Sequence, residues 1–276
     1  MFKFIFFFLS LIPLYLFSET KTLTFAPLVT EDVEEINTQF LPMIKYLEKK
    51  LNVNIQIDYN SDYNTLLEKF INGKIDMAYL GPLPYLTLEE KYPNTMPLVN
   101  FKNEKGEVSY TCSFVSFIST EGSIENMTNT KIALTQPLST CGYLFVNDVL
   151  NNSNANIEKN KYKYLDRHDE VALSVIRDEF KYGGLKTDIA QGFTHLGLKE
   201  IVRSKEIPSF VLVGNSKTLD NNMLTNIKST MLSIEKEESL TWDKNIKFGT
   251  KEINNADYDY LRKLVKSTKI SHESNF

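Results

Sequence analysis

The segment PLSTCGY, residues 137–143, places two hydroxyls and a thiol side by side at the start of a predicted helix. It follows the apolar run KIALT and precedes YLFVNDVL, so it is the turn between a strand and a helix. A helix N-terminus presents unpaired N–H groups and the positive end of a dipole, so it favours anions. Ser139 and Thr140 add hydroxyl donors, and Gly142 allows a close backbone approach. This turn has the chemistry to hold a tetrahedral oxyanion such as phosphate, and an ordinary helix cap is the alternative.

His168 is a second candidate donor. It begins another predicted helix in the same half of the chain, directly after the predicted strand KYKYL, in the segment DRHDEVA. A histidine at that place can donate a hydrogen bond to an anion, and a bound dianion would favour its charged form. The alternative interpretation is a helix-start histidine that faces water.

The elements that position these residues alternate between strand and helix. In the first part of the chain the pattern predicts strands at 22–28, 52–59, 75–80 and 96–101 and helices at 40–51, 62–73 and 84–91. Such alternation is typical of an α/β fold with a mostly parallel sheet covered by helices. Ligands of these sheets bind at the carboxyl ends of the strands.

The second part of the chain repeats the pattern. Strands are predicted at 110–119, 131–135, 161–165 and 182–185, helices at 168–177 and from Asp188, two strands broken by Pro208 within 198–214, and helices after about 220. Two similar α/β halves, each able to bury a core, predict two lobes with a ligand cleft between them.

Composition and the first residues bear on the compartment. The 276 residues are 42% hydrophobic and 12% aromatic, which suits a packed core and excludes disorder. Lys3 and the apolar run that follows it predict a signal peptide over residues 1–18 and export to the periplasm, and an uncleaved membrane anchor is the alternative. The net charge of −4 gives no sign of nucleic-acid binding.

Motifs of catalysis are missing from the sequence. It has no HExxH, CxxC or GxSxG segment, and its three histidines are too few for two-metal phosphate chemistry. We expect neither an enzyme nor a bound metal or cofactor.

STCGY, followed about 25 residues later by HDEVALSV, resembles the periplasmic binding proteins of phosphate, phosphite and phosphonate ABC importers. FLPMIKYLEKKLNVNI, DYNTLLEKFINGKIDMAYLGPLPY, SYTCSFVSF and IPSF match the family in the same order, over roughly residues 22–235. The resemblance implies a type II-like two-lobed fold, with lobe 1 at 19–108 and 205–276 and lobe 2 at 109–204. It implies a monomer that captures a small anion and delivers it to an ABC permease. A periplasmic sensor that signals to a membrane kinase is the alternative.

The resemblance also implies roles for single residues. Ser139 and Thr140 match the phosphonate-binding hydroxyls, and His168 matches the histidine that contacts the same oxygens. Two tyrosines of the family's cleft correspond to Tyr63 and Tyr110. Asp188 falls near an acidic position that faces the amine in aminophosphonate binders. The segment FKYGGLKTDIA around it departs from the family's acidic-small pattern at Lys181 and Tyr182.

Two departures from the family affect the ligand and the cysteines. Ser209 and Phe210 stand where binders of amine-bearing ligands have another carboxylate, which favours phosphate, phosphite or a small apolar-tailed phosphonate. Cys141 stands where the family has a second serine. If strand 110–119 runs antiparallel beside strand 131–135, Cys112 meets Cys141 at the cleft and a disulfide forms there; two separate thiols are the alternative.

Overall fold

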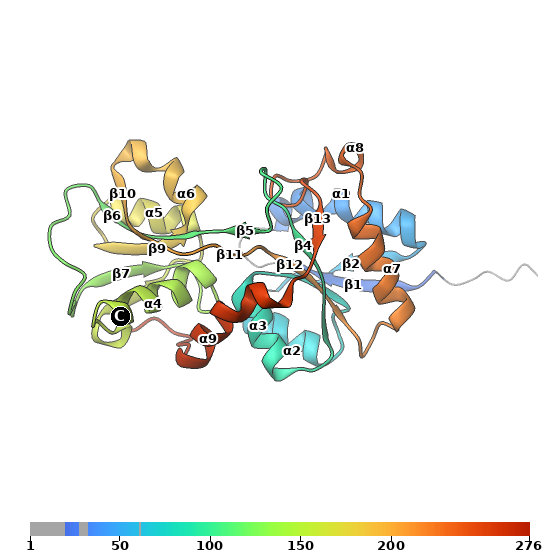
Figure 1. The fold of residues 1–276 in the computed structure, drawn as a ribbon, viewed down its shortest axis with the longest axis horizontal. Helices are drawn as coiled ribbons and strands as arrows, with labels where there is room; N and C mark the ends of the chain where they lie inside the picture. The colour runs from blue at the N-terminus through green and yellow to red at the C-terminus, as the bar shows by residue number, and fades with distance from the viewer. Residues whose placement is uncertain (1–19, 28–32, 61) are drawn as a thin grey trace, which may run out of the picture.

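The computed structural model describes residues 20–27, 33–60 and 62–276, which form two lobes side by side (Figure 1). We call the lobe around the six-stranded sheet lobe 1 and the lobe around the five-stranded sheet lobe 2. The predicted signal segment at 1–18 lies outside the described residues. None of the helices in the described ranges is long and apolar enough to cross a membrane.

The lobe 1 sheet has the strand order β13-β4-β12-β3-β1-β2. Its strands are β1 (Thr22–Ala26), β2 (Asn54–Ile57), β3 (Met77–Leu80), β4 (Thr95–Phe101), β12 (Val211–Asn215) and β13 (Thr250–Glu252). β1 pairs in parallel with β2 and β3, whereas β12 returns from lobe 2 and inserts antiparallel between β3 and β4.

Helices cover the faces of this sheet with apolar stripes. In the longest of them, Ile36, Phe40 and Met43 recur at helical spacing and are buried. The helix that the pattern placed at 84–91 begins two residues earlier, because prolines occupy its first turn, where no intrahelical N–H bond is required. The lobe 1 helices are α1 (Val33–Leu51), α2 (Tyr63–Ile71), α3 (Pro82–Lys91), α7 (Asn221–Leu232) and α8 (Lys236–Ser239). The 3-10 turn η4 (Asn255–Tyr258) and α9 (Asp259–Ser267) follow at the end of the chain.

The lobe 2 sheet has the strand order β10-β6-β9-β7-β8. Its strands are β6 (Cys112–Phe117), β7 (Lys131–Leu134), β8 (Lys161–Tyr164), β9 (Tyr182–Lys186) and β10 (Leu198–Arg203). The helical segments of the lobe are the π-helical turn η1 (Thr140–Leu144), α4 (Phe145–Asn152), η2 (Ile157–Lys159), α5 (His168–Ile176), α6 (Thr187–Gly192) and η3 (Thr194–Leu196).

The structure corrects three details of the predicted topology. Both sheets are mixed rather than mostly parallel, because the strands that enter and leave each lobe run antiparallel to their neighbours. The predicted strand 110–119 is not beside 131–135: β9 lies between β6 and β7, paired antiparallel with one and parallel with the other. Pro208 does not break two strands but lies within a separate short strand, β11 (Ile207–Pro208).

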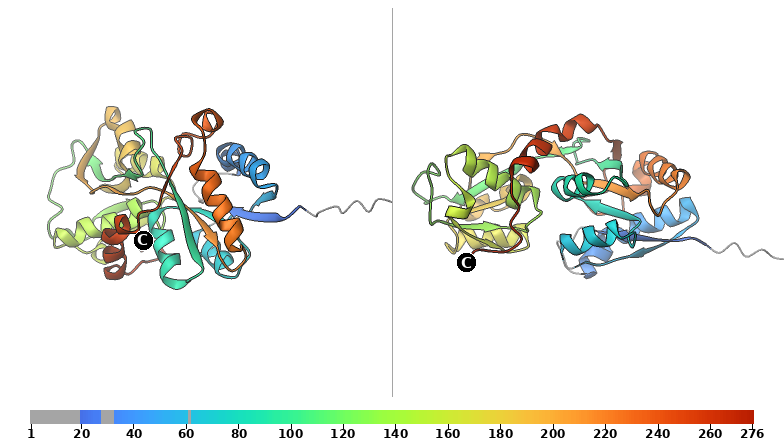
Figure 2. Two further views of the ribbon diagram at one scale, coloured as in Figure 1. Left: turned by 45° about the vertical axis from the view of Figure 1, so that its right-hand side comes forward. Right: turned by 90° about the horizontal axis from the view of Figure 1, so that it is seen from below.

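Within the described residues, three connections join the lobes. β11 pairs antiparallel with β5 (Ser109–Tyr110), and this two-stranded ribbon carries the chain into lobe 2 and back. The third connection consists of α9 and the segment that follows it. We call this following segment, residues 268–276, the C-terminal strap. α9 lies at the junction of the lobes in Figure 1 and in the right-hand view of Figure 2, and it contacts α3 of lobe 1.

The C-terminal strap ends on lobe 2. Tyr143 Oη donates to the carbonyl of Lys269 (2.8 Å), and Tyr164 Oη donates to the carbonyl of Ser271 (2.6 Å). The N–H of Tyr162, in β8, donates to Asn275 Oδ1 (2.7 Å). The lobe limits expected from the sequence stay a prediction, and these bonds connect the last part of 205–276 to lobe 2.

Candidate ligand-binding site

A pocket lies between the lobes. Residues that follow β7 and β8, and the last residue of β9, supply its lobe 2 side, which is the carboxyl edge of three parallel-running strands. Lobe 1 supplies its opposite wall from the starts of α2, α3 and β12. The lining residues are Tyr63, Gly81, Pro84, Tyr110, Thr135, Gln136, Leu138, Ser139, Thr140, Cys141, Asp166, His168, Lys186 and Phe210.

The turn after β7 presents free donors to this pocket. Ser139 is the N-cap of η1, and its Oγ accepts the N–H of Gly142 at 2.9 Å. Because the Ser139 oxygen accepts this bond, its own hydrogen is available to a ligand. The N–H groups of Thr140 and Cys141 occupy the first two helical positions and have no acceptor within the helix.

Gly142 explains how the turn closes so tightly. A Cβ at this position would lie 1.8 Å from Thr135 Oγ1 and 2.7 Å from Thr135 N, so no larger residue fits. The turn therefore packs directly on the end of β7.

Thr135 is a site residue that the sequence analysis missed. Its side chain is buried, it lines the pocket, and its hydroxyl is a buried polar atom without a hydrogen-bond partner in the described part of the chain. Leaving a buried hydroxyl unpaired costs about 1–3 kcal/mol, so an oxyanion that accepts its hydrogen would recover that cost. Its position directly after an apolar strand was the available signal.

Thr140 lines the pocket as expected and also joins the two lobes. Its Oγ1 accepts the N–H of Leu83, at the start of α3 in lobe 1, at 3.0 Å in a buried position. This bond holds the binding turn against the N-terminus of a lobe 1 helix. Thr140 therefore connects the turn that presents the donors to lobe 1.

Cys112 and Cys141 form a disulfide, so the alternative of two separate thiols does not apply in the structure. The geometric reason differs from the expected one. Cys112 pairs with Lys186 at the carboxyl end of β9, and the turn that carries Cys141 crosses over this same strand. Gly184 makes the crossing possible, because a Cβ there would lie 2.7 Å from the carbonyl oxygen of Cys141. The disulfide fixes the binding turn to β6, and its sulfur atoms have no S–H to donate.

His168 is the first residue of α5 and lines the pocket. The backbone N–H of Lys186 donates to its Nδ1 at 3.3 Å, so the neutral ring carries its hydrogen on Nε2. Burial, and then the nearby Lys186 charge, lower the pKa of His168 to about 4. His168 is therefore a neutral donor before a ligand binds.

The walls of the pocket are aromatic. Phe210 stacks on Tyr79 of the lobe 1 core (centroids 5.1 Å apart) and on Tyr110 of the crossing ribbon (5.9 Å). Tyr63, at the start of α2, lies on the same lining. Burial raises the pKa of both Tyr63 and Tyr110, so their hydroxyls stay protonated and remain donors.

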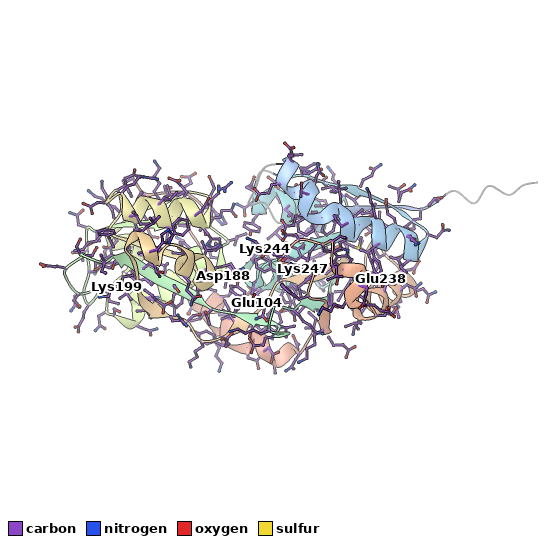
Figure 3. The ribbon with its side chains drawn as sticks, turned by 90° about the horizontal axis from the view of Figure 1, so that it is seen from above. Glu104, Asp188, Lys199, Glu238, Lys244 and Lys247 are labelled. Carbon is purple, nitrogen blue, oxygen red and sulfur yellow. A yellow bond between two sulfur atoms is a disulfide. The ribbon has the colours of Figure 1, made fainter. Side chains whose placement is uncertain are left out.

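The structure does not place Asp188 in the pocket lining. Its side chain is 66% exposed, and it lies at the edge of lobe 2 that faces lobe 1 (Figure 3). Asp188 follows β9 by two residues, which turns it away from the lining, and the residue that lines the pocket from this segment is Lys186. The sequence analysis missed Lys186, Gln136 and Asp166, since only the meeting of three strand ends brings them together.

Comparisons with known proteins identify the family of the chain. Residues 25–258 match the family described as ABC transporter, phosphonate, periplasmic substrate-binding protein. The chain belongs to this family. It is a periplasmic, phosphorus-oxyanion-binding component of an ABC importer, and it is a binding protein rather than an enzyme.

Relatives and solved structures resemble the chain over most of its length. The phosphate-import protein PhnD of Mycolicibacterium smegmatis is 24% identical over 277 residues, covering 90% of this chain and 86% of the relative. PhnD1 of Prochlorococcus marinus, solved with methylphosphonate, has a TM-score of 0.76 at 16% identity and covers 90% of this chain and 98% of its own. A binding protein of a Pseudomonas aeruginosa phosphonate transporter has the same TM-score and identity, covering 89% of this chain and 86% of its own. These likenesses establish the two-lobed fold.

Proposed function

We propose that the protein captures phosphate, phosphite or a small phosphonate in the pocket between its lobes and delivers it to a membrane permease. The observation that carries this proposal is the convergence of neutral donors from the ends of two neighbouring strands, β7 and β8. They are the hydroxyls of Ser139 and Thr135, the N–H groups of Thr140 and Cys141, and Nε2 of His168. Together they match the acceptor oxygens of one tetrahedral oxyanion.

The walls favour a ligand with little besides the phosphoryl group. Tyr63, Pro84 and Phe210 close the lobe 1 side with apolar carbon, which suits a hydrogen, a methyl group or a further oxygen on phosphorus. The names of similar proteins support the same ligand class: one is a phosphate-import protein, and another was solved with methylphosphonate.

Calorimetric titration of the mature chain with phosphate, phosphite and methylphosphonate tests the proposal. We expect tight binding of at least one of them, and a loss of at least a hundredfold in affinity for Ser139→Ala with Thr140→Ala. Asp220→Ala is the matched control, because Asp220 caps α7 through Met223 N (2.8 Å) and does not line the pocket. If the folded, unmodified protein bound none of the three ligands, that result would contradict the proposal.

Export and partners follow from the same role. We propose cleavage of the signal peptide after Ser18, a monomeric mature protein, and an ABC permease as its partner. Mass spectrometry of the periplasmic protein would test the cleavage site. Light scattering would test the monomer, and ligand uptake by vesicles that contain the permease would test delivery.

A further inference from the structure

Lys186 brings a positive charge into a pocket whose other donors are neutral and whose lining also includes the Asp166 carboxylate. It ends β9, and among the described residues that line the pocket it is the only lysine or arginine. Its side chain is 19% exposed. The donors proposed to bind the phosphoryl group do not include this residue, so its charge needs a separate explanation.

The surroundings of Lys186 orient its ammonium, and its ion pair with Asp188 is long and exposed to solvent. The Nζ lies 5.2 Å from the ring centroid of Tyr110 and 5.4 Å from that of Phe210, which is the geometry of a cation held on aromatic faces. Its carboxylate neighbour is Asp188, at 3.7 Å from Nζ to Oδ2. That separation exceeds hydrogen-bonding range, and the exposed Asp188 carboxylate is screened by solvent.

The placement of the charge decides which part of a ligand meets it. The phosphoryl donors come from the ends of β7 and β8, whereas the Lys186 ammonium lies against Tyr110 and Phe210. The proposal places a substituent on phosphorus against this aromatic wall. A substituent that carries an ammonium would meet a second cation there. At about 5 Å and the effective dielectric of a partly buried site, this repulsion is large enough to lower affinity at least tenfold.

We propose that Lys186 determines the charge selectivity of the pocket: it favours oxyanions whose substituent is uncharged or anionic and excludes those with an ammonium group. The inference rests on the proposed function, since it concerns the ligand class of the same pocket. It assigns to Lys186 the opposite of the role that the sequence resemblance suggested for Asp188. Phosphate and alkylphosphonates are ligands in this scheme, and aminoalkylphosphonates are not.

A pair of ligands of equal size isolates the charge. Ethylphosphonate and aminomethylphosphonate differ by a methyl group in place of an ammonium, and their affinities can be compared by calorimetry at one pH. For the unmodified protein we expect ethylphosphonate to bind at least tenfold tighter. Lys186→Met should lower this ratio at least tenfold, and Lys186→Arg, which keeps the charge, should preserve it. Asp188→Asn should leave the ratio unchanged or raise it.

Other outcomes would overturn the inference. A ratio near one in the unmodified protein, or an unchanged ratio in Lys186→Met, would show that Lys186 does not select ligands by charge. Loss of aminomethylphosphonate binding in Asp188→Asn would assign Asp188 as an ammonium partner instead. Rejection of both ligands by the unmodified protein and by Lys186→Met would mean that size sets the selectivity. In each case binding of methylphosphonate keeps the proposed function intact, whereas loss of all phosphorus oxyanions would contradict that function itself.

Discussion

Removal of the Cys112–Cys141 disulfide should lower the free energy of unfolding by an amount that depends on the length of the loop it closes. The cysteines are 29 positions apart, so the bond closes a loop of about 30 residues in the unfolded chain. The chain-entropy relation gives a loss of about 12 cal/mol/K, which is about 3.6 kcal/mol at 25 °C. Both residues are buried, and serine in both positions leaves no free thiol. For Cys112→Ser with Cys141→Ser we therefore expect the free energy of unfolding to fall by roughly the entropic amount, about 3–4 kcal/mol.

Urea unfolding under non-reducing conditions measures this loss directly. The midpoint should fall for the double variant, and the slope of the free energy of unfolding against urea should rise, because the opened chain exposes more surface. Adding reductant to the unmodified protein is the matched control, since it opens the same loop without a substitution. A loss of less than about 1 kcal/mol in both experiments would refute the argument that the bond acts through the unfolded chain.

Three further perturbations test other parts of the site. Because the pKa of His168 is about 4 when folded and about 6.5 when unfolded, only the unfolded chain binds this proton between those pH values. Stability should therefore fall as pH falls from 7 to 5, by about 2 kcal/mol through this group, and urea midpoints of His168→Gln should lack that part. Gly142→Ala should cost about 1–3 kcal/mol in urea unfolding and abolish calorimetric binding, because its Cβ would meet Thr135; Gly192→Ala, where nothing lies within 4 Å, is the control that should not lose binding. Deleting residues 269–276 removes the bonds to Tyr143 and Tyr164 and should lower the melting temperature by several degrees, and an unchanged value would show that the C-terminal strap contributes nothing.

The turn at 137–143 could be recognised from sequence because its signals are local. An apolar strand, small capping residues and an amphipathic helix follow one another in the chain, and the structure keeps them in that order. His168 was accessible for the same reason, since it begins a helix directly after a strand. Local pattern alone therefore located two of the three strand ends that form the pocket.

Lys186 was not accessible, because its role depends on strand order. β9 lies between β6 and β7, and no spacing in the sequence states that arrangement. The expectation that β6 and β7 are neighbours led to the correct cysteine pair through an incorrect geometry. The sequence analysis named Asp188 rather than Lys186 for the same reason. The chain changes direction between β9, which ends at Lys186, and α6, which contains Asp188, so that Lys186 lines the pocket and Asp188 does not.

The C-terminal strap has a practical consequence for measuring ligand capture. The described chain begins beside β1 on lobe 1, and it ends on lobe 2, where the Phe276 ring lies 5.9 Å from that of Phe180 (Figure 1). A fluorophore at each end of the mature chain would therefore be carried by a different lobe. Relative rotation of the lobes would change the separation of the dyes, so an end-labelled chain would act as an optical reporter of free oxyanion in solution.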